Sequence, residues 1–424
     1  MEKQKLTKLE LSWILYDVGN SAFVLLVATI LPIYFNSLAE QAGLSQVDYL
    51  AYWGYAASVV TLLVAVIGPV FGTISDTKGY KKPIFTISML VGVAGCAFLS
   101  FPRSWIMFLA VFVIAKIGYS SSLIFYDAML SDVTAPERMD SVSSQGYAWG
   151  YIGSCIPFVL SLILVLGGEG MGLSMTAAMA AAFLINAVWW LLCTLPLLRH
   201  FRQVHGVERH HNPVRESFAR LRYVLKDMKK DRRVFLFLVA FFFYIDGVYT
   251  IIDMATAYGE ALGMDSTGLL LALLLTQLVA FPFALIFGRA ARRYENDKLI
   301  RFCILAYTAI ALFAIQLDQQ WEFWVLAVFV GMFQGGIQAL SRSYFAKIIP
   351  AEKSGEYFGI FDICGKGASF MGTALVGLFA QITGSPNAGV AVLAVMFLTG
   401  YLLFGKAVKT QGAWEERSGT VIRR

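Results

Sequence analysis

The chain has 424 residues, of which 58% are hydrophobic and only 15% charged, and its formal net charge is +6. So few charged side chains cannot solvate a globule of this size, which excludes an ordinary soluble enzyme. The five cysteines lie within apolar segments and lack the spacing of a zinc site or a disulfide framework. We therefore expect no metal and no cofactor, and interpret the cysteines as packing residues.

Apolar segments follow one another from Leu11 to Val408, with a single long basic interruption from Leu198 to Arg233. Because a helix needs about 20 apolar residues to cross a bilayer, the pattern gives about twelve crossings. The sequence thus predicts an all-α membrane protein with two six-helix bundles, residues 1–197 and 234–424, joined by a cytoplasmic linker, residues 198–233. Paired halves of this kind are typical of transporters.

Polar residues interrupt the expected helices at helical spacing, taken here in chain order. Helix one carries Asp17, Asn20 and Ser21 on one face, and helix four carries Lys116 and Asp127. A charge inside the hydrocarbon costs about 2.5–3.5 kcal/mol on insertion scales, so such residues usually face a cavity or a partner. In helix five, glycines before Pro157 indicate close helix packing.

The linker holds all four histidines, which we interpret as solvated loop residues rather than metal ligands. From Val214 to Met228 its apolar residues recur at helical spacing with basic residues between them, which predicts an amphipathic helix along the membrane surface. Beyond it, helix seven carries Asp246, Tyr249 and Asp253. Helix ten carries a polar stripe that ends at Arg342, and helix eleven could form an Asp362–Lys366 pair.

The polar residues of helices one, four, seven and ten form the candidate site. The candidate substrate or coupling-ion residues are Asp17, Asn20, Lys116, Asp246, Tyr249, Asp253, Gln334 and Gln338. Asp246, midway through its helix, is the preferred proton-coupling residue. Lys116 could hold a substrate carboxylate or neutralise one of the acids, and the two glutamines suit a zwitterion or a polyol equally. Asp127 and Arg342 could form a gating salt bridge or snorkel separately to headgroups.

Lys and Arg gather in every second connection, including Lys78 to Lys82 and Arg289 to Arg301. Positive loops are retained in the cytoplasm, so both termini should be cytoplasmic, in a bacterial inner membrane. The retention of Lys and Arg in cytoplasmic loops then explains the positive net charge of the chain. We therefore expect no nucleic-acid partner. A cleaved signal peptide ending near Ser37-Leu38-Ala39 is the alternative for the N-terminus, although its apolar run is longer than a usual signal core.

The halves match each other at an offset of about 215 residues, which indicates parallel repeats. At this offset Gly72 falls on Gly288, and Asp127 falls on Arg342. Parallel repeats place a substrate path along the axis between the halves.

The string Gly72-Thr-Ile-Ser-Asp76-Thr-Lys-Gly79 resembles the loop between helices two and three of the major facilitator superfamily. Three further strings, residues 15–23, 125–138 and 334–343, are together similar to the vacuole-effluxer-like family of that superfamily. The resemblance runs from helix one to helix eleven. It implies a fold of two pseudo-symmetric bundles, and a latch in which Asp76 holds the start of helix eleven when the inner gate closes.

The fungal members of this family are described as exporters of amino acids from the vacuole. We therefore expect a monomeric secondary transporter that moves a small polar, amino-acid-like solute by alternating access among membrane lipids, with export coupled to a proton. A lipid or lysolipid flippase of the same fold is the alternative. We expect no enzyme, since no hydrolase or metalloprotease motif occurs, and the lack of a Gly-x-x-x-x-Gly-Lys string favours a gradient as the energy source.

Overall fold

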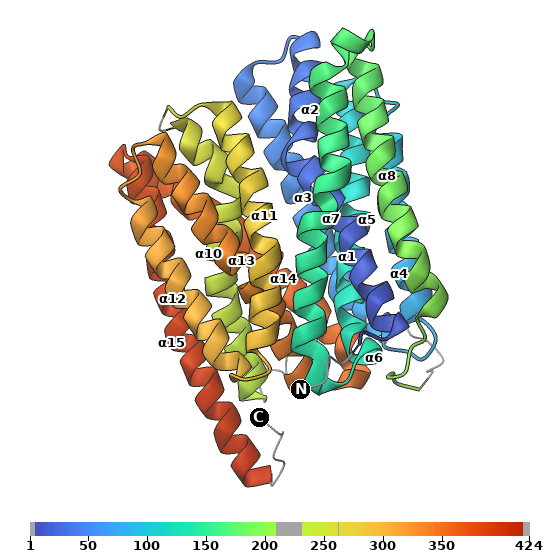
Figure 1. Cartoon of the computed structure of the whole chain (residues 1–424), viewed down its shortest axis with the longest axis vertical. Coiled ribbons are helices and arrows are strands. Elements are labelled where there is room, and N and C mark those ends of the chain that lie inside the picture. The colour runs from blue at the N-terminus through green and yellow to red at the C-terminus, as the bar shows by residue number, and fades with distance from the viewer. Residues whose placement is uncertain (1–4, 209–230, 262, 419–424) are drawn as a thin grey trace.

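The computed structural model describes residues 5–208, 231–261 and 263–418 (Figure 1). Helices make up nearly all of this part of the chain. The expected amphipathic helix of the linker lies outside the described residues, as does the side chain of Lys366. The expected all-α fold is confirmed.

The helices before the linker form one group and those after it form a second (Figure 1). The first group consists of α1 (Lys8–Ala28), α2 (Ile30–Gln41), α3 (Gln46–Ser75), α4 (Lys81–Phe98), α5 (Trp105–Ala128), α6 (Leu130–Val133), α7 (Met139–Gly167) and α8 (Met175–His200). The second consists of α10 (Arg232–Ala261), α11 (Ser266–Ala290), α12 (Asn296–Ala314), α13 (Gln320–Ile348), α14 (Ser354–Thr383) and α15 (Pro386–Ser418). Short 3-10 turns precede α7, α8 and α14.

Ten segments of the described chain are long and apolar enough to cross a membrane, and the first of them joins α1 and α2. The two other long helices, α12 and α14, have 19 and 30 residues. The protein is therefore an integral membrane protein, while the count of twelve crossings and the domain boundaries at residues 197 and 234 stay predictions.

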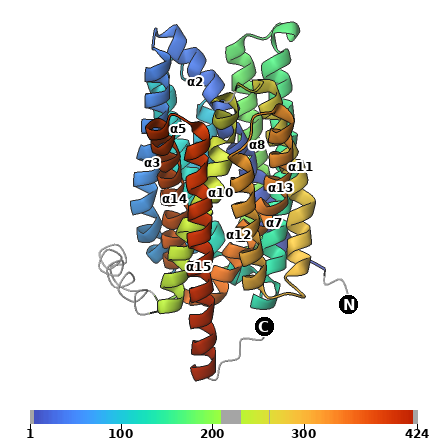
Figure 2. The same ribbon diagram turned by 90° about the vertical axis from the view of Figure 1, so that its left-hand side faces the viewer.

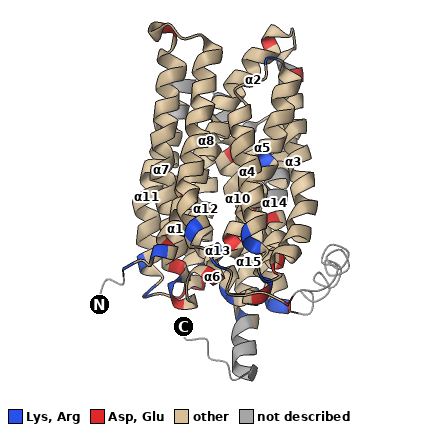
Figure 3. Ribbon diagram, turned by 90° about the vertical axis from the view of Figure 1, so that its right-hand side faces the viewer, with Lys and Arg blue, Asp and Glu red and all other residues tan. Residues whose placement is uncertain are grey.

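The two ends of the bundle differ in charge. Most Lys and Arg gather at the end near both chain termini, interspersed with Asp and Glu, whereas the opposite end carries few charged residues, mainly Asp and Glu (Figure 3). We call the first the basic end; it holds the connections after α3, α5, α11 and α13. At the opposite end, Ser45, Ser104, Ser174 and Asp265 cap the helices that begin there by accepting a backbone N–H bond. These caps fix where each returning helix starts.

The two groups meet along two helix pairs, α3 with α14 and α7 with α11, the first of which is visible in Figure 2. Near the basic end a Cβ atom on Gly72 would lie 2.3 Å from the carbonyl oxygen of Gly355. A Cβ atom on Gly288 would lie 2.6 Å from the Cβ atom of Ser144. The repeat-related glycines thus let both helix pairs approach closely, and the basic end is closed.

Candidate functional site

Asp76 joins the end of α3 to the start of α14. Its two carboxylate oxygens accept backbone N–H bonds from Gly355 and Glu356, at 2.7 and 2.9 Å. The first turn of a helix has unpaired N–H groups and a partial positive charge, so it suits a carboxylate. Burial raises the pKa of Asp76 to about 7, although nearby Lys81 and the two N–H bonds act in the opposite direction. The contact expected of a latch is therefore present, and its gating role stays a proposal.

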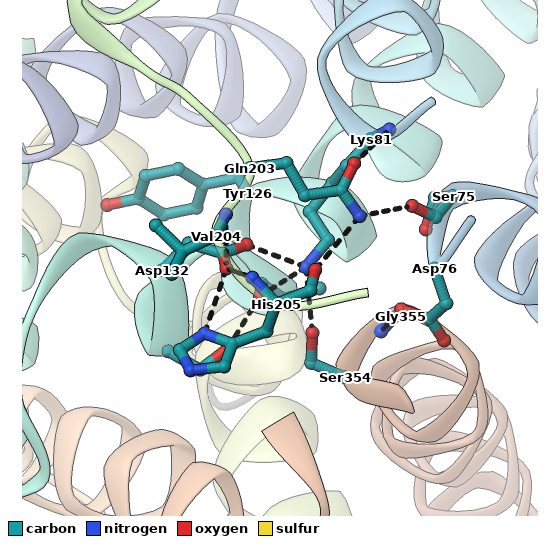
Figure 4. A network of polar contacts seen from close by, with 12 residues as sticks. Ser75, Asp76, Lys81, Tyr126, Asp132, Gln203, Val204, His205, Ser354 and Gly355 are labelled. Atoms are coloured by element: carbon teal, nitrogen blue, oxygen red, sulfur yellow. Dashed lines mark hydrogen bonds and ion pairs between the residues drawn. The ribbon is translucent and has the colours of Figure 1, made fainter. Parts of the chain in front are cut away.

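Lys81 forms a second connection beside this contact (Figure 4). Its side chain is fully buried, and its Nζ atom lies 2.8 Å from Asp132 and 2.9 Å from the hydroxyl of Ser354. A buried ion pair is sensitive to loss of either partner, because the remaining charge is then uncompensated. The pair links α4 and α6 to the first residue of α14.

The segment that follows α8 supports this network from the outside (Figure 4). The Gln203 side chain accepts backbone N–H bonds from Gly79 and Lys81 and donates to the carbonyl of Ser75. The backbone N–H of His205 donates to Asp132, 2.7 Å away, and its ring lies 3.1 Å from the same oxygen. His205 is thus a partner of a buried carboxylate, and the expectation of a solvated loop residue is wrong for it.

Arg342, near the end of α13, connects the halves deeper in the bundle. Its guanidinium lies 3.0 Å from the Asp127 carboxylate and 3.5 Å from that of Asp17. It also donates to the hydroxyl and the carbonyl of Ser143, at 2.9 and 3.1 Å. The side chain is almost fully buried, so these groups replace its water shell. One arginine therefore ties α13 to α1, α5 and α7.

Aromatic rings surround the same guanidinium. Its central carbon lies 4.6 Å from the ring centre of Trp13, 4.4 Å from Tyr147 and 5.4 Å from Tyr126. Such contacts favour the planar guanidinium over an ammonium group. The Tyr126 hydroxyl also donates to Asp17, 2.9 Å away, and orients it.

Asp140, which the sequence analysis did not single out, forms another connection between the halves. Its carboxylate pairs with Lys347 and accepts hydrogen bonds from Ser343 and Asn296, each at 2.6 Å. These partners are more than 150 residues away in the chain. Neither hydrophobic periodicity nor a local motif could have identified them.

Asp246 lies away from the basic end, fully buried in α10. One carboxylate oxygen accepts the backbone N–H of Gly372, in α14, at 3.0 Å and the Thr250 hydroxyl at 3.3 Å. The other oxygen is buried without a hydrogen-bond partner among the residues that the structure describes. A buried polar atom in this state calls for an explanation, because most such atoms are paired.

The remaining candidates take several environments. Asn20 is buried and donates to Asp17 at 3.3 Å, and Gln334 is buried and donates to Gln277 at 3.1 Å. The Lys116 ammonium lies 5.1 Å from the ring centre of Tyr119. Other candidates are less buried: Tyr249 and Gln338 are partly exposed, and Asp253 is exposed.

The recorded contacts thus bring Asp17, Asn20, Asp127 and Arg342 into one cluster. By contrast, Asp246 bonds to α14 and Gln334 to α11. Across the described residues, no group of His, Cys, Asp and Glu is arranged to hold a metal ion.

Solved structures with this arrangement of helices are transporters. One is the transporter FucP in its outward conformation, with a TM-score of 0.71 and 13% identity, covering 94% of this chain and 97% of FucP. The human organic anion transporter MFSD10 gives a TM-score of 0.69 at 16% identity, covering 93% of this chain and 98% of that protein. The fold is that of the major facilitator superfamily, as the sequence predicted.

A family profile described as "Vacuole effluxer Atg22 like" matches residues 6–137 and 131–417, and the chain belongs to this family. It is 42% identical over 405 residues to "Uncharacterized MFS-type transporter YxiO" of Bacillus subtilis, with 94% of this chain and 95% of the relative covered. It is 28% identical to "Autophagy-related protein 22" of Cryptococcus neoformans, covering 69% of this chain but only 57% of the fungal protein.

Proposed function

We propose that this transporter exports a small polar, amino-acid-like solute in exchange for a proton, with its basic end in the cytoplasm of a bacterial cell. The observation that carries proton coupling is Asp246, a fully buried carboxyl with one oxygen that has no hydrogen-bond partner among the described residues. An ionised carboxylate held in this way is costly, whereas a bound proton removes the charge. A group of this kind can take up and release a proton as its surroundings change.

The helix α14 supplies the mechanical link to the gate. Its first turn bonds to Asp76, and its Gly372 N–H bonds to Asp246. At 1.5 Å per residue, the 17 residues from Gly355 to Gly372 span about 26 Å of one helix. Movement of α14 at the basic end would therefore change the surroundings of the proton site.

Arg342 and its two carboxylate partners suit a zwitterionic solute. The carboxylate of an amino acid can replace Asp17 or Asp127 on the guanidinium, and its ammonium group can pair with the carboxylate that is released. Exchange of this kind would loosen the tie between α13 and the first half, which makes solute binding and gate opening one event. The amino-acid class itself rests on the family resemblance.

The test uses protein reconstituted into liposomes, with a mixture of labelled amino acids and a pH-sensitive dye inside. We expect a pH gradient to drive amino-acid movement against its own gradient, and a protonophore to abolish it. The variant Asp246→Asn should retain exchange of labelled for unlabelled solute at equal pH but lose pH-driven accumulation. Asp318→Asn, an exposed acid of the same half, is the matched control and should retain both.

Retention of pH-driven accumulation in Asp246→Asn would overturn its coupling role. Failure of every amino acid to move, with movement of a labelled lysolipid instead, would favour the flippase alternative. Movement that needs ATP but no gradient would contradict secondary transport.

A further inference from the structure

A pocket of about 850 Å³ opens at the basic end between α7 and α11, outside the cluster around Arg342. This volume lies in the range of about 300–1,000 Å³ that is usual for ligand sites. Among the described residues, its lining includes four basic side chains and no acidic one: Lys5, Arg289, Arg292 and Arg293. The proposed transport mechanism uses none of them.

These basic side chains are available to a ligand. All four are exposed, and none of them forms an ion pair in the described part of the chain. Arg292 donates to the hydroxyl of Ser141 in α7, 3.0 Å away, across the line where the halves meet. The hydroxyl of Ser144, which also lines the pocket, is buried without a hydrogen-bond partner among the described residues.

Apolar surface adjoins the basic side chains on α11. Leu285 and Ile286 line the same pocket, and Ile286 is 49% exposed. Ile286 precedes Arg289 by three residues, so the two share one helix face. A ligand that fits must therefore carry a negative charge at the level of the arginines and an apolar part toward the membrane.

We propose that the pocket binds an anionic phospholipid of the leaflet at the basic end, with its phosphate on Arg289 and Arg293 and its acyl chains along Ile286. Basic pockets between transmembrane helices are suited to such headgroups. The lipid would contact α7 and α11 together, and these helices belong to different halves. Its binding should therefore favour the state in which the basic end is closed.

The experiment measures lipid binding to purified full-length protein by native mass spectrometry. The probes are dioleoyl phosphatidylglycerol, dioleoyl phosphatidylcholine and glycerol 3-phosphate. We expect bound phosphatidylglycerol to survive release from detergent, phosphatidylcholine to bind much more weakly, and glycerol 3-phosphate neither to bind nor to compete. This comparison uses the unaltered chain, so it does not depend on the folding of a variant.

The variant Arg289→Gln, Arg293→Gln should weaken phosphatidylglycerol binding by roughly 25-fold, because each basic group near an anionic lipid contributes a factor of about five. Arg289→Lys, Arg293→Lys keeps both charges and should bind within about threefold of the original. The control Lys406→Gln, Lys409→Gln removes two exposed lysines at the same end but outside the pocket. It should bind phosphatidylglycerol normally.

Four outcomes would overturn the proposal. Two concern the ligand: equal binding of the two phospholipids, and competition by glycerol 3-phosphate, which would indicate a soluble anion instead. Two concern the variants: an equal loss of binding in the control Lys406→Gln, Lys409→Gln, and unchanged binding in Arg289→Gln, Arg293→Gln. A melting temperature without lipid, measured for every variant, shows that each one is folded.

Discussion

The substitution Gly72→Ala should force the basic end open. A Cβ atom at this position would lie 2.3 Å from the carbonyl oxygen of Gly355 and 2.8 Å from its carbonyl carbon, whereas ordinary contacts begin at 3.4 Å. Both obstacles are backbone atoms and cannot rotate away. Helices α3 and α14 would have to separate by about 1 Å, and overpacking of this kind costs about 1–3 kcal/mol.

The clash is confined to the closed state, so its cost shifts the balance between closed and open forms by about 5- to 150-fold. Spin labels on cysteines at Lys78 and Lys353, both exposed and on opposite sides of the α3–α14 contact, would report the separation as a distance distribution. The five native cysteines must first be replaced. We expect Gly72→Ala to move the main population to a longer distance.

The matched control is Gly54→Ala, because a Cβ atom on Gly54, in the same helix, meets nothing within 4 Å. It should leave the distances as they are. If Gly72→Ala and Gly54→Ala give the same distribution, close glycine contact does not hold the basic end closed.

Three further predictions concern α14 and the residues that contact it. Lys81→Met removes the buried lysine from Asp132, whose charge then has, among the described residues, only the contacts with Val204 and His205, and should destabilise the protein by about 3–5 kcal/mol in thermal unfolding. Lys78→Met, at an exposed position, should cost little. Gly372→Ala places a Cβ atom 2.4 Å from the carboxyl of the proposed proton site and should impair pH-driven transport. Gly377→Ala, in open space on the same helix, should not; equal transport in the two variants would count against the proton site. Because burial raises the pKa of Asp76 to about 7, the closed state binds a proton more tightly than an open state with this residue solvated. The fraction of closed protein, measured from spin-label distances, should therefore fall as the pH rises toward 7 and stay constant above it. Asp76→Asn should remove this pH dependence.

Apolar segment length, charge placement and short motifs were enough to predict the fold class and the family. They depend on local sequence: a crossing needs a run of apolar residues, and Gly72 and Asp76 lie in one loop string. The sequence also indicated Arg342 as a candidate partner of Asp127, because the internal repeat aligns these two positions.

The contacts of Asp132 and Asp140 could not be predicted in this way. Lys81 was interpreted only as a topology signal, since a basic residue at a helix end looks the same whether it is solvated or paired. The partner of Asp140 is 207 residues away. Only the packing of the two halves brings such groups together.

Alternating access through the basic end can be tested by locking that end. Cysteines at Lys78 and Lys353, in a chain without the native cysteines, would be joined by a short reducible cross-linker after reconstitution into liposomes. We expect cross-linking to stop pH-driven movement of labelled amino acids and reduction to restore it, because the halves must separate at this end in every cycle. Transport at an unchanged rate by fully cross-linked protein would contradict alternating access through the basic end.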